Sequence, residues 1–229
     1  MFNRLHYYFS NGMLGRAELL ITACCVFFCL SVHEFAHGYA AYKLGDNTAK
    51  YMGRLNLSPF SHLGPIGAIC LFLFGFGWAK PVPINPSNFK SGKYKSGMVI
   101  TALAGPAANI ILAFVSLLMF KIISVVYGNA SGIVGTVATI VLVLLRVLVS
   151  MNLSLAVFNI IPIPPLDGSK VLSAVLPSRI YFRLMEYERY GFIVLIILIN
   201  TSFFSNIMYG ITNLILRGFN AVLSLIPFL

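Results

Sequence analysis

The stretch SVHEFAHGYAAYKLGD, residues 31–46, places two histidines and a glutamate at the end of a long apolar run. The run before it, AELLITACCVFFCL (residues 17–30), has the composition of a membrane-spanning helix. An ionisable side chain inside a bilayer is costly, and is therefore a functional-site hypothesis by default. The first helix is thus predicted to place a functional site inside the membrane.

The composition is that of an integral membrane protein. Of the 229 residues, 59% are hydrophobic and 10% are charged, whereas soluble domains carry about 25% charged residues. Most of the basic residues behind the net charge of +10 lie in short loops between apolar segments, a pattern typical of the positive-inside rule. Because no basic face or stripe is present, nucleic-acid binding is excluded. We expect a single integral-membrane domain over residues 1–229.

Apolar stretches of about 20 residues predict transmembrane helices. We therefore expect an all-α multi-pass membrane protein with about five to six transmembrane helices, and a re-entrant loop or small β element after the first helix. The expected helices lie near residues 17–43, 97–127, 132–158, 189–208 and 209–228.

The stretch LGPIGAICLFLFGFGW (residues 63–78) is short and is broken by glycine and proline. Basic residues cluster in three segments, 43–54, 80–95 and 162–189. If these segments are cytoplasmic, residues 63–78 begin and end on the same side of the membrane. This favours a re-entrant element, which is tolerated where protein or water covers its backbone.

The pentapeptide HEFAH fits the pattern H-E-x-x-H. On a helix, His33 and His37 lie one turn apart on the same face, so both imidazoles can bind one zinc ion. Glu34 can then reach a zinc-activated water as general base. The alternative is a pair of interior histidines beside a salt-bridged glutamate, which is costly in lipid.

A catalytic zinc needs a third protein ligand and one open position. Lys43 occupies the position of the third histidine in a metzincin-type motif, and the next glutamate along the chain is Glu186. Asp46 would require a sharp fold-back, and Cys29 is more typical of a packing residue. Asp167, in NIIPIPPLDGSK, is the remaining candidate.

The predicted topology brings Asp167 to the depth of the two histidines. The first helix and the helix near 132–158 both run inward, and Asp167 follows the second at the same membrane face. The prolines before it prevent a regular helix, and Gly168 allows an unusual turn. The alternative role for this aspartate is to cap a helix over SKVLSAVL.

Three motifs together resemble the site-2 protease family of intramembrane zinc metalloproteases. They are HEFAH, AGPAAN (residues 104–109) and NIIPIPPLDG (residues 159–168), in that order and in a membrane context. The chain is most similar to the short subgroup that lacks PDZ or CBS domains. The resemblance implies an intramembrane zinc endopeptidase.

The resemblance also implies roles for individual residues. One zinc ion per chain would be bound by His33, His37 and Asp167, with the motif glutamate activating the water. Asn159 would hold the substrate or stabilise the oxyanion. Asn109 would bind substrate, although an interhelical hydrogen bond or simple helix packing is the alternative for this residue.

The family cleaves transmembrane helices of other membrane proteins, so the implied partners are such a substrate and the lipid bilayer. We expect a prokaryotic cell membrane, with the active site toward the cytoplasm; the oligomeric state stays open. The segment GRLNLSPF (residues 53–60) alternates polar and apolar residues. We expect this segment, alone or together with KPVPINP (residues 80–86), to act as an edge or gate that accepts an unwound substrate, with Arg54 and Asn56 binding the substrate.

Two other functions compete with proteolysis. A metal transporter could use the histidines and aspartate as a transit site, but it has no need of Glu34 and usually shows two repeats. A catalytically silent binder of membrane helices could lose Glu34 without losing zinc. The intact glutamate favours the protease.

Overall fold

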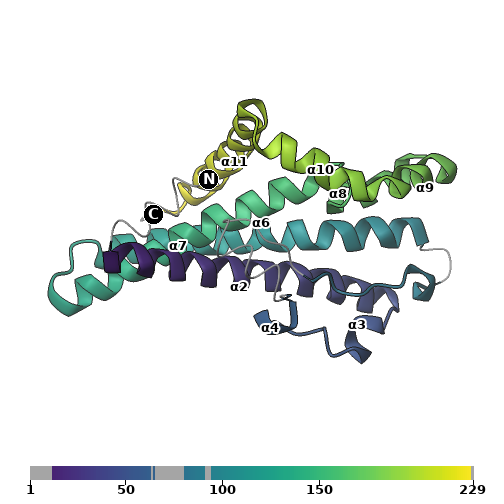
Figure 1. Cartoon of the computed structure of the whole chain (residues 1–229). Coiled ribbons are helices and arrows are strands. Elements are labelled where there is room, and N and C mark those ends of the chain that lie inside the picture. Colours follow the sequence, from purple (N-terminus) through teal and green to yellow (C-terminus); the bar gives the residue numbers. More distant parts are fainter. Residues whose placement is uncertain (1–11, 63, 65–79, 91–93, 228–229) are drawn as a thin grey trace.

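Three long helices lying side by side form the body of the protein (Figure 1). The computed structural model describes residues 12–62, 64, 80–90 and 94–227. The three helices each contain a window long and apolar enough to cross a membrane. They are α2 (Gly12–Leu44), α6 (Tyr94–Tyr127) and α7 (Gly132–Ile160), which correspond to the first three predicted spans.

On helix α6, side-chain size rather than polarity distinguishes the buried residues from the exposed ones. Its large apolar residues, such as Ile100 and Ile111, point outward and are 51% and 64% exposed. Its buried positions are small or polar: Gly97, Thr101, Ala102, Gly105, Pro106, Asn109, Ala113 and Ser116, besides Leu117. Small residues allow the backbones of membrane helices to approach closely, which explains how α2 and α7 both pack against α6.

The C-terminal part contains two helices joined at a sharp bend. Helices α10 (Glu188–Ile199) and α11 (Ser202–Leu223) meet at 85°, and the Thr201 hydroxyl caps α11 by accepting a hydrogen bond from the backbone N–H of Phe204 at 3.2 Å. The predicted boundary between residues 208 and 209 is therefore wrong, because the break lies at residues 200–201. In the described ranges three helices qualify as spans, or four if the bent pair counts as one, so the expected five to six are not confirmed.

A small apolar core joins α11 to the body. The buried side chains of α6, α7 and α11 meet there, and Phe114 and Phe219 pack edge-on with ring centroids 5.1 Å apart. The buried members are Ala113, Leu117, Val149, Leu153 and Leu223.

The described part of the connection from α2 to α6 contains three short helices: α3 (Thr48–Tyr51), α4 (Pro59–His62) and the 3₁₀ helix η1 (Pro86–Asn88). Residues 53–58 form a turn, a bend and irregular chain that lead into α4, and the described residues contain no strand, so the expected small β element is not present there. Residues 63 and 65–78 of the predicted re-entrant stretch lie outside the described residues.

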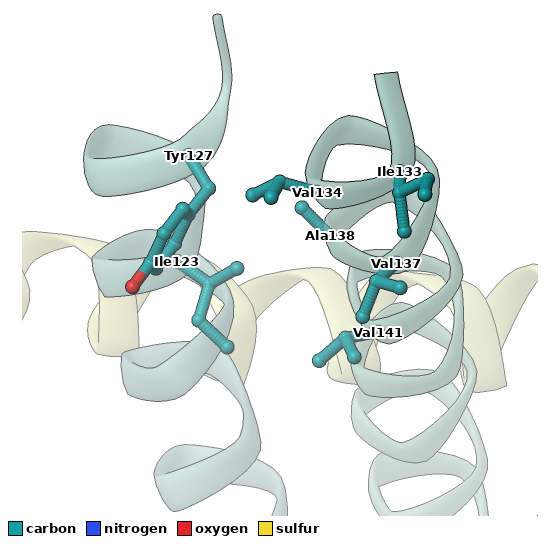
Figure 2. Close-up of a pocket in the computed structure, with 7 residues that line it drawn as sticks. All are labelled: Ile123, Tyr127, Ile133, Val134, Val137, Ala138 and Val141. Atoms are coloured by element: carbon teal, nitrogen blue, oxygen red, sulfur yellow. The ribbon is translucent and has the colours of Figure 1, made fainter. Parts of the chain in front are cut away.

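The other end of the α6–α7 pair is apolar and loosely packed. Ile123 and Tyr127 on α6 face Val134, Val137 and their neighbours on α7 across a cavity of about 370 Å³ (Figure 2). We call this region the distal end, because it is the end of the helix pair remote from the metal centre described below.

Candidate metal centre

His33 and His37 present their imidazoles to each other on the buried face of α2. Their Nε2 atoms are 3.0 Å apart, and the rings meet edge-on with centroids 4.6 Å apart. The two residues are 4% and 5% exposed. This geometry follows from their spacing, since residues four apart on a helix are neighbours on one face.

Asp167 joins them from the first residue of α8 (Asp167–Val175). Its Oδ2 lies 3.0 Å from Nε2 of His33 and 2.9 Å from Nε2 of His37. Its Oδ1 accepts a hydrogen bond from Nζ of Lys170 at 3.0 Å. The carboxylate is therefore held at both oxygens, with one of them turned toward the histidines.

Two glycines let the chain come this close. A Cβ on Gly168 would lie 2.0 Å from the carbonyl oxygen of Ile160, so the turn after α7 can close only on a residue without a side chain. A Cβ on Gly105 would lie 2.4 Å from Nε2 of His37 and 2.7 Å from Cε1 of His33. Helix α6 therefore forms one wall of the centre with bare backbone.

The donor atoms fit a bound cation. Nδ1 of His37 lies 2.6 Å from the carbonyl oxygen of Thr101; because a carbonyl can only accept, Nδ1 carries a proton, and in the neutral imidazole Nε2 is then the atom that can bind a metal. This Nε2 lies beside Asp167 and the other imidazole, and the three ligand atoms lie within 4.8 Å of one another. Electron-rich atoms converge in this way around a metal, and two histidines with one carboxylate suit zinc.

The other two candidates for the third ligand are occupied elsewhere. Sγ of Cys29 accepts a hydrogen bond from Nδ2 of Asn152 at 3.1 Å. Asp46 is fully buried and accepts hydrogen bonds from the backbone N–H groups of Thr48 at 3.0 Å and Asn85 at 2.7 Å. Among the residues that the structure describes, the cluster of possible ligands is His33, His37 and Asp167.

Glu34 lies beside this cluster and is held by the chain that precedes α6. Its Oε2 accepts a hydrogen bond from the backbone N–H of Val82 at 2.9 Å. Val82 is flanked by Pro81 and Pro83, which have no N–H. The carboxylate is therefore oriented by one backbone group, in the segment 80–85.

A cavity of about 510 Å³ opens at the cluster. Its polar wall is formed by the three candidate ligands together with Glu34, Asn159 and Lys170. Its other walls are apolar and come from five parts of the chain, so the site is a polar patch at one side of an apolar chamber. The apolar lining consists of Leu30, Pro81, Val82, Ile84, Leu155, Phe158, Pro165, Leu166, Phe192, Leu195, Ile196 and Ile199.

Asn159 faces this cavity, whereas the other predicted substrate residues lie away from its lining. Nδ2 of Asn159 donates to the carbonyl oxygen of Leu155 at 3.0 Å. Arg54 donates to the carbonyl oxygen of Lys80 at 2.7 Å, and Nδ2 of Asn56 donates to that of Gly53 at 2.7 Å.

Asn109, the remaining predicted substrate residue, is fully buried within α6. Its side-chain Oδ1 and Nδ2 both lack a hydrogen-bond partner among the described residues. Its predicted contact with substrate therefore stays a prediction.

Sequence reasoning missed the groups that support the predicted residues. The carbonyl of Thr101 and the N–H of Val82 are backbone atoms, which no residue type signals. Gly105 belongs to the AGPAAN motif, and its close approach could have been suspected from the small residues around it. Lys170 lies three residues after Asp167, a spacing that places two side chains together on a helix.

Comparisons with known proteins agree with this chemistry. The model of peptidase family M50 matches residues 21–204. YwhC of Bacillus subtilis is 36% identical over 196 residues, which cover 84% of this chain and 87% of the relative. Rip2 of Mycolicibacterium smegmatis is 27% identical over 197 residues, or 82% of this chain and 69% of the relative. Both are named as zinc metalloproteases, and no solved structure matches.

Proposed function

The chain belongs to peptidase family M50, the site-2 protease family of zinc metalloproteases, and we propose that it cleaves transmembrane helices of other membrane proteins. The observation that carries this proposal is a convergence. The three candidate zinc ligands and Glu34 line one cavity beside helices apolar enough to span a membrane. Few other arrangements explain a base and a metal site placed in such apolar surroundings.

We propose that His33, His37 and Asp167 bind the zinc ion. Bound there, zinc would supply a Lewis acid that lowers the pKa of a water molecule and polarises the scissile carbonyl. Thr101 orients the imidazole of His37 from behind, and Lys170 orients the carboxylate of Asp167. Such supporting partners fix the direction of each ligand.

Glu34 is proposed as the general base. Its carboxylate takes a proton from the water while the water oxygen bonds to the carbonyl carbon of the substrate. When the peptide C–N bond breaks, the same proton passes to the leaving nitrogen. The hydrogen bond from Val82 at 2.9 Å keeps the carboxylate facing the cavity during both transfers.

Asn159 is proposed to stabilise the negative charge that develops on the substrate oxygen. An amide nitrogen carries two hydrogens, and Asn159 commits one of them to the carbonyl of Leu155. The second can be donated into the cavity, where a dry environment strengthens such a bond.

The substrate must enter this cavity with its backbone unwound, because a helical peptide bond is shielded by its own hydrogen bonds. The apolar walls suit the side chains of a former transmembrane helix. We propose that Arg54 and Asn56 support substrate binding through the chain beside the cavity, since Arg54 binds the backbone of residues 80 and 81. The basic loops favour a cytoplasmic side for this entrance.

The test compares wild type with Glu34→Gln in liposomes that contain a synthetic transmembrane peptide substrate. We expect about one zinc per chain in both proteins and a loss of cleavage of at least ~10²-fold in the mutant. Glu186→Gln, at an exposed glutamate on α9 (Ser178–Glu186), is the matched control and should cleave normally. Full cleavage by Glu34→Gln, or zinc flux across the liposomes without cleavage, would refute the proposal.

A further inference from the structure

Unpaired polar atoms lie behind the metal centre, where α2 meets α6. Asn109 is 0% exposed, yet its side-chain oxygen and nitrogen have no hydrogen-bond partner in the described part of the chain. His33 is 4% exposed, and its Nδ1 has no partner either. Buried polar groups are nearly always hydrogen-bonded, so each exception calls for an explanation.

The register of the two helices places Asn109 one turn beyond the residue that touches both imidazoles. His37 on α2 meets Thr101 on α6, and one turn further along α6, Gly105 touches both imidazoles. The helices are thus antiparallel, and the next turn of α6 carries Asn109. A helical side chain leans toward the N-terminal end of its helix, so that of Asn109 leans toward the turn of Gly105.

Gly105 leaves the way open for this side chain. Any larger residue at that position would fill the space against Cε1 of His33. Cε1 is bonded to Nδ1, the unpaired atom of the same ring. The missing side chain of Gly105 and the leaning side chain of Asn109 are therefore complementary.

We propose that, when zinc is bound, Oδ1 of Asn109 turns to accept a hydrogen bond from Nδ1–H of His33 and so positions this imidazole for the metal. With zinc bound at Nε2, the proton of the neutral imidazole lies on Nδ1, which then needs an acceptor. Asn109 would accept a hydrogen bond from Nδ1–H of His33, as the carbonyl of Thr101 accepts one from Nδ1–H of His37. The inference rests on the proposed zinc site, and it assigns Asn109 a positioning role in place of substrate contact.

The experiment measures zinc affinity by competition with a chelator in purified wild type, Asn109→Leu and Asn109→Asp. We expect Asn109→Leu to bind zinc ~10- to 100-fold more weakly, the usual effect of losing a ligand's hydrogen-bond partner. Asn109→Asp keeps an acceptor oxygen and should restore the affinity. Asn152→Leu is the matched control, because Asn152 is equally buried but bonds Cys29 and its own helix; its zinc affinity should stay unchanged.

A spectroscopic readout separates positioning from general structure. In cobalt-loaded protein, Asn109→Leu should shift the visible absorption bands, whereas Asn152→Leu should not. Unchanged zinc affinity in Asn109→Leu, or a raised KM with normal affinity and spectrum, would overturn the inference and favour substrate contact.

Two further outcomes are distinguishable. If wild type binds no zinc, the proposed function itself fails. If Asn109→Leu does not fold, ¹⁵N-histidine NMR of zinc-loaded wild type decides. Two exchange-protected Nδ1–H signals are expected, and a single one, from His37, would overturn the inference.

Discussion

Helix α6 packs against its neighbours in different ways at its two ends, against α2 at the metal centre and against α7 at the distal end. At the metal centre, α6 contributes the carbonyl of Thr101 and the bare backbone of Gly105, both pressed against histidines of α2. At the distal end, Val134 and Val137 of α7 are 55% and 54% exposed and border an apolar cavity (Figure 2). Lipid tails are as apolar as valine, so the distal end gains little from close packing. The metal end must exclude lipid, because lipid tails offer no hydrogen-bond partners to its polar atoms.

Gly105→Ala should produce the largest effect, since it adds a methyl group at the metal end. The new Cβ would lie 2.4 Å from Nε2 of His37, so a candidate zinc ligand must move. We expect zinc affinity to fall ~10- to 100-fold, measured as zinc retained after dialysis against a chelator. Gly218→Ala on α11, where a Cβ meets nothing within 4 Å, is the control. Equal zinc retention in the two variants would show that the metal end tolerates an added methyl group.

Asp46→Asn should have an intermediate effect, because Asp46 fastens the chain beside the metal end. Burial raises the pKa of Asp46, but hydrogen bonds from Thr48, Asn88 and Asn85 outweigh it and leave the pKa below its usual value. We expect the mutant to lose ~1–3 kcal/mol of stability at pH 7, as for hydrogen bonds to a charged group.

The pH dependence of the Asp46 effect has a defined sign. The stabilisation is complete above the carboxyl pKa of the unfolded chain, about 3.9, and is lost as the pH falls through the lower pKa of the folded state. Thermal unfolding in detergent at pH 7 and at decreasing pH checks this. The gap between wild type and mutant should narrow below about pH 4, and a gap that is constant with pH would exclude the carboxylate as its source.

Val137→Ala should have the smallest effect, because it alters the distal end. The side chain is 54% exposed, and its loss should cost less than ~1 kcal/mol with zinc affinity unchanged. Val149→Ala, on the same helix but 7% exposed, should cost more because it leaves a cavity in a packed core. Denaturant titration in micelles measures both. A larger loss from Val137→Ala would mean that the distal end is packed against something.

Much of the fold could be predicted from the sequence, because hydropathy follows directly from the solvent. Helices α2, α6 and α7 lie where apolar runs predict them. The bend between α10 and α11 was misplaced, because residues 200–201 interrupt an apolar run too briefly for hydropathy to register. The expected β element at residues 53–60 failed because alternation of polar and apolar residues does not supply a partner strand.

The functional site, like the fold, could be predicted only in part from the sequence. The H-E-x-x-H spacing and the charge bias together predicted that His33, His37 and Asp167 would lie close together, and the structure places them so. Their supporting contacts could not be predicted in this way. Thr101 and Val82 act through backbone atoms, whose positions depend on how distant segments pack and not on side-chain identity.

The segment 80–85 is fastened mainly through its own main chain. Arg54 binds the carbonyls of Lys80 and Pro81, Glu34 binds the N–H of Val82, and Asp46 binds the N–H of Asn85. Hydrogen bonds to main-chain atoms depend on the number of residues between the bonded positions more than on the side chains at those positions. The length of the segment is therefore constrained, since one residue inserted before Val82 would bring a different peptide group to Glu34.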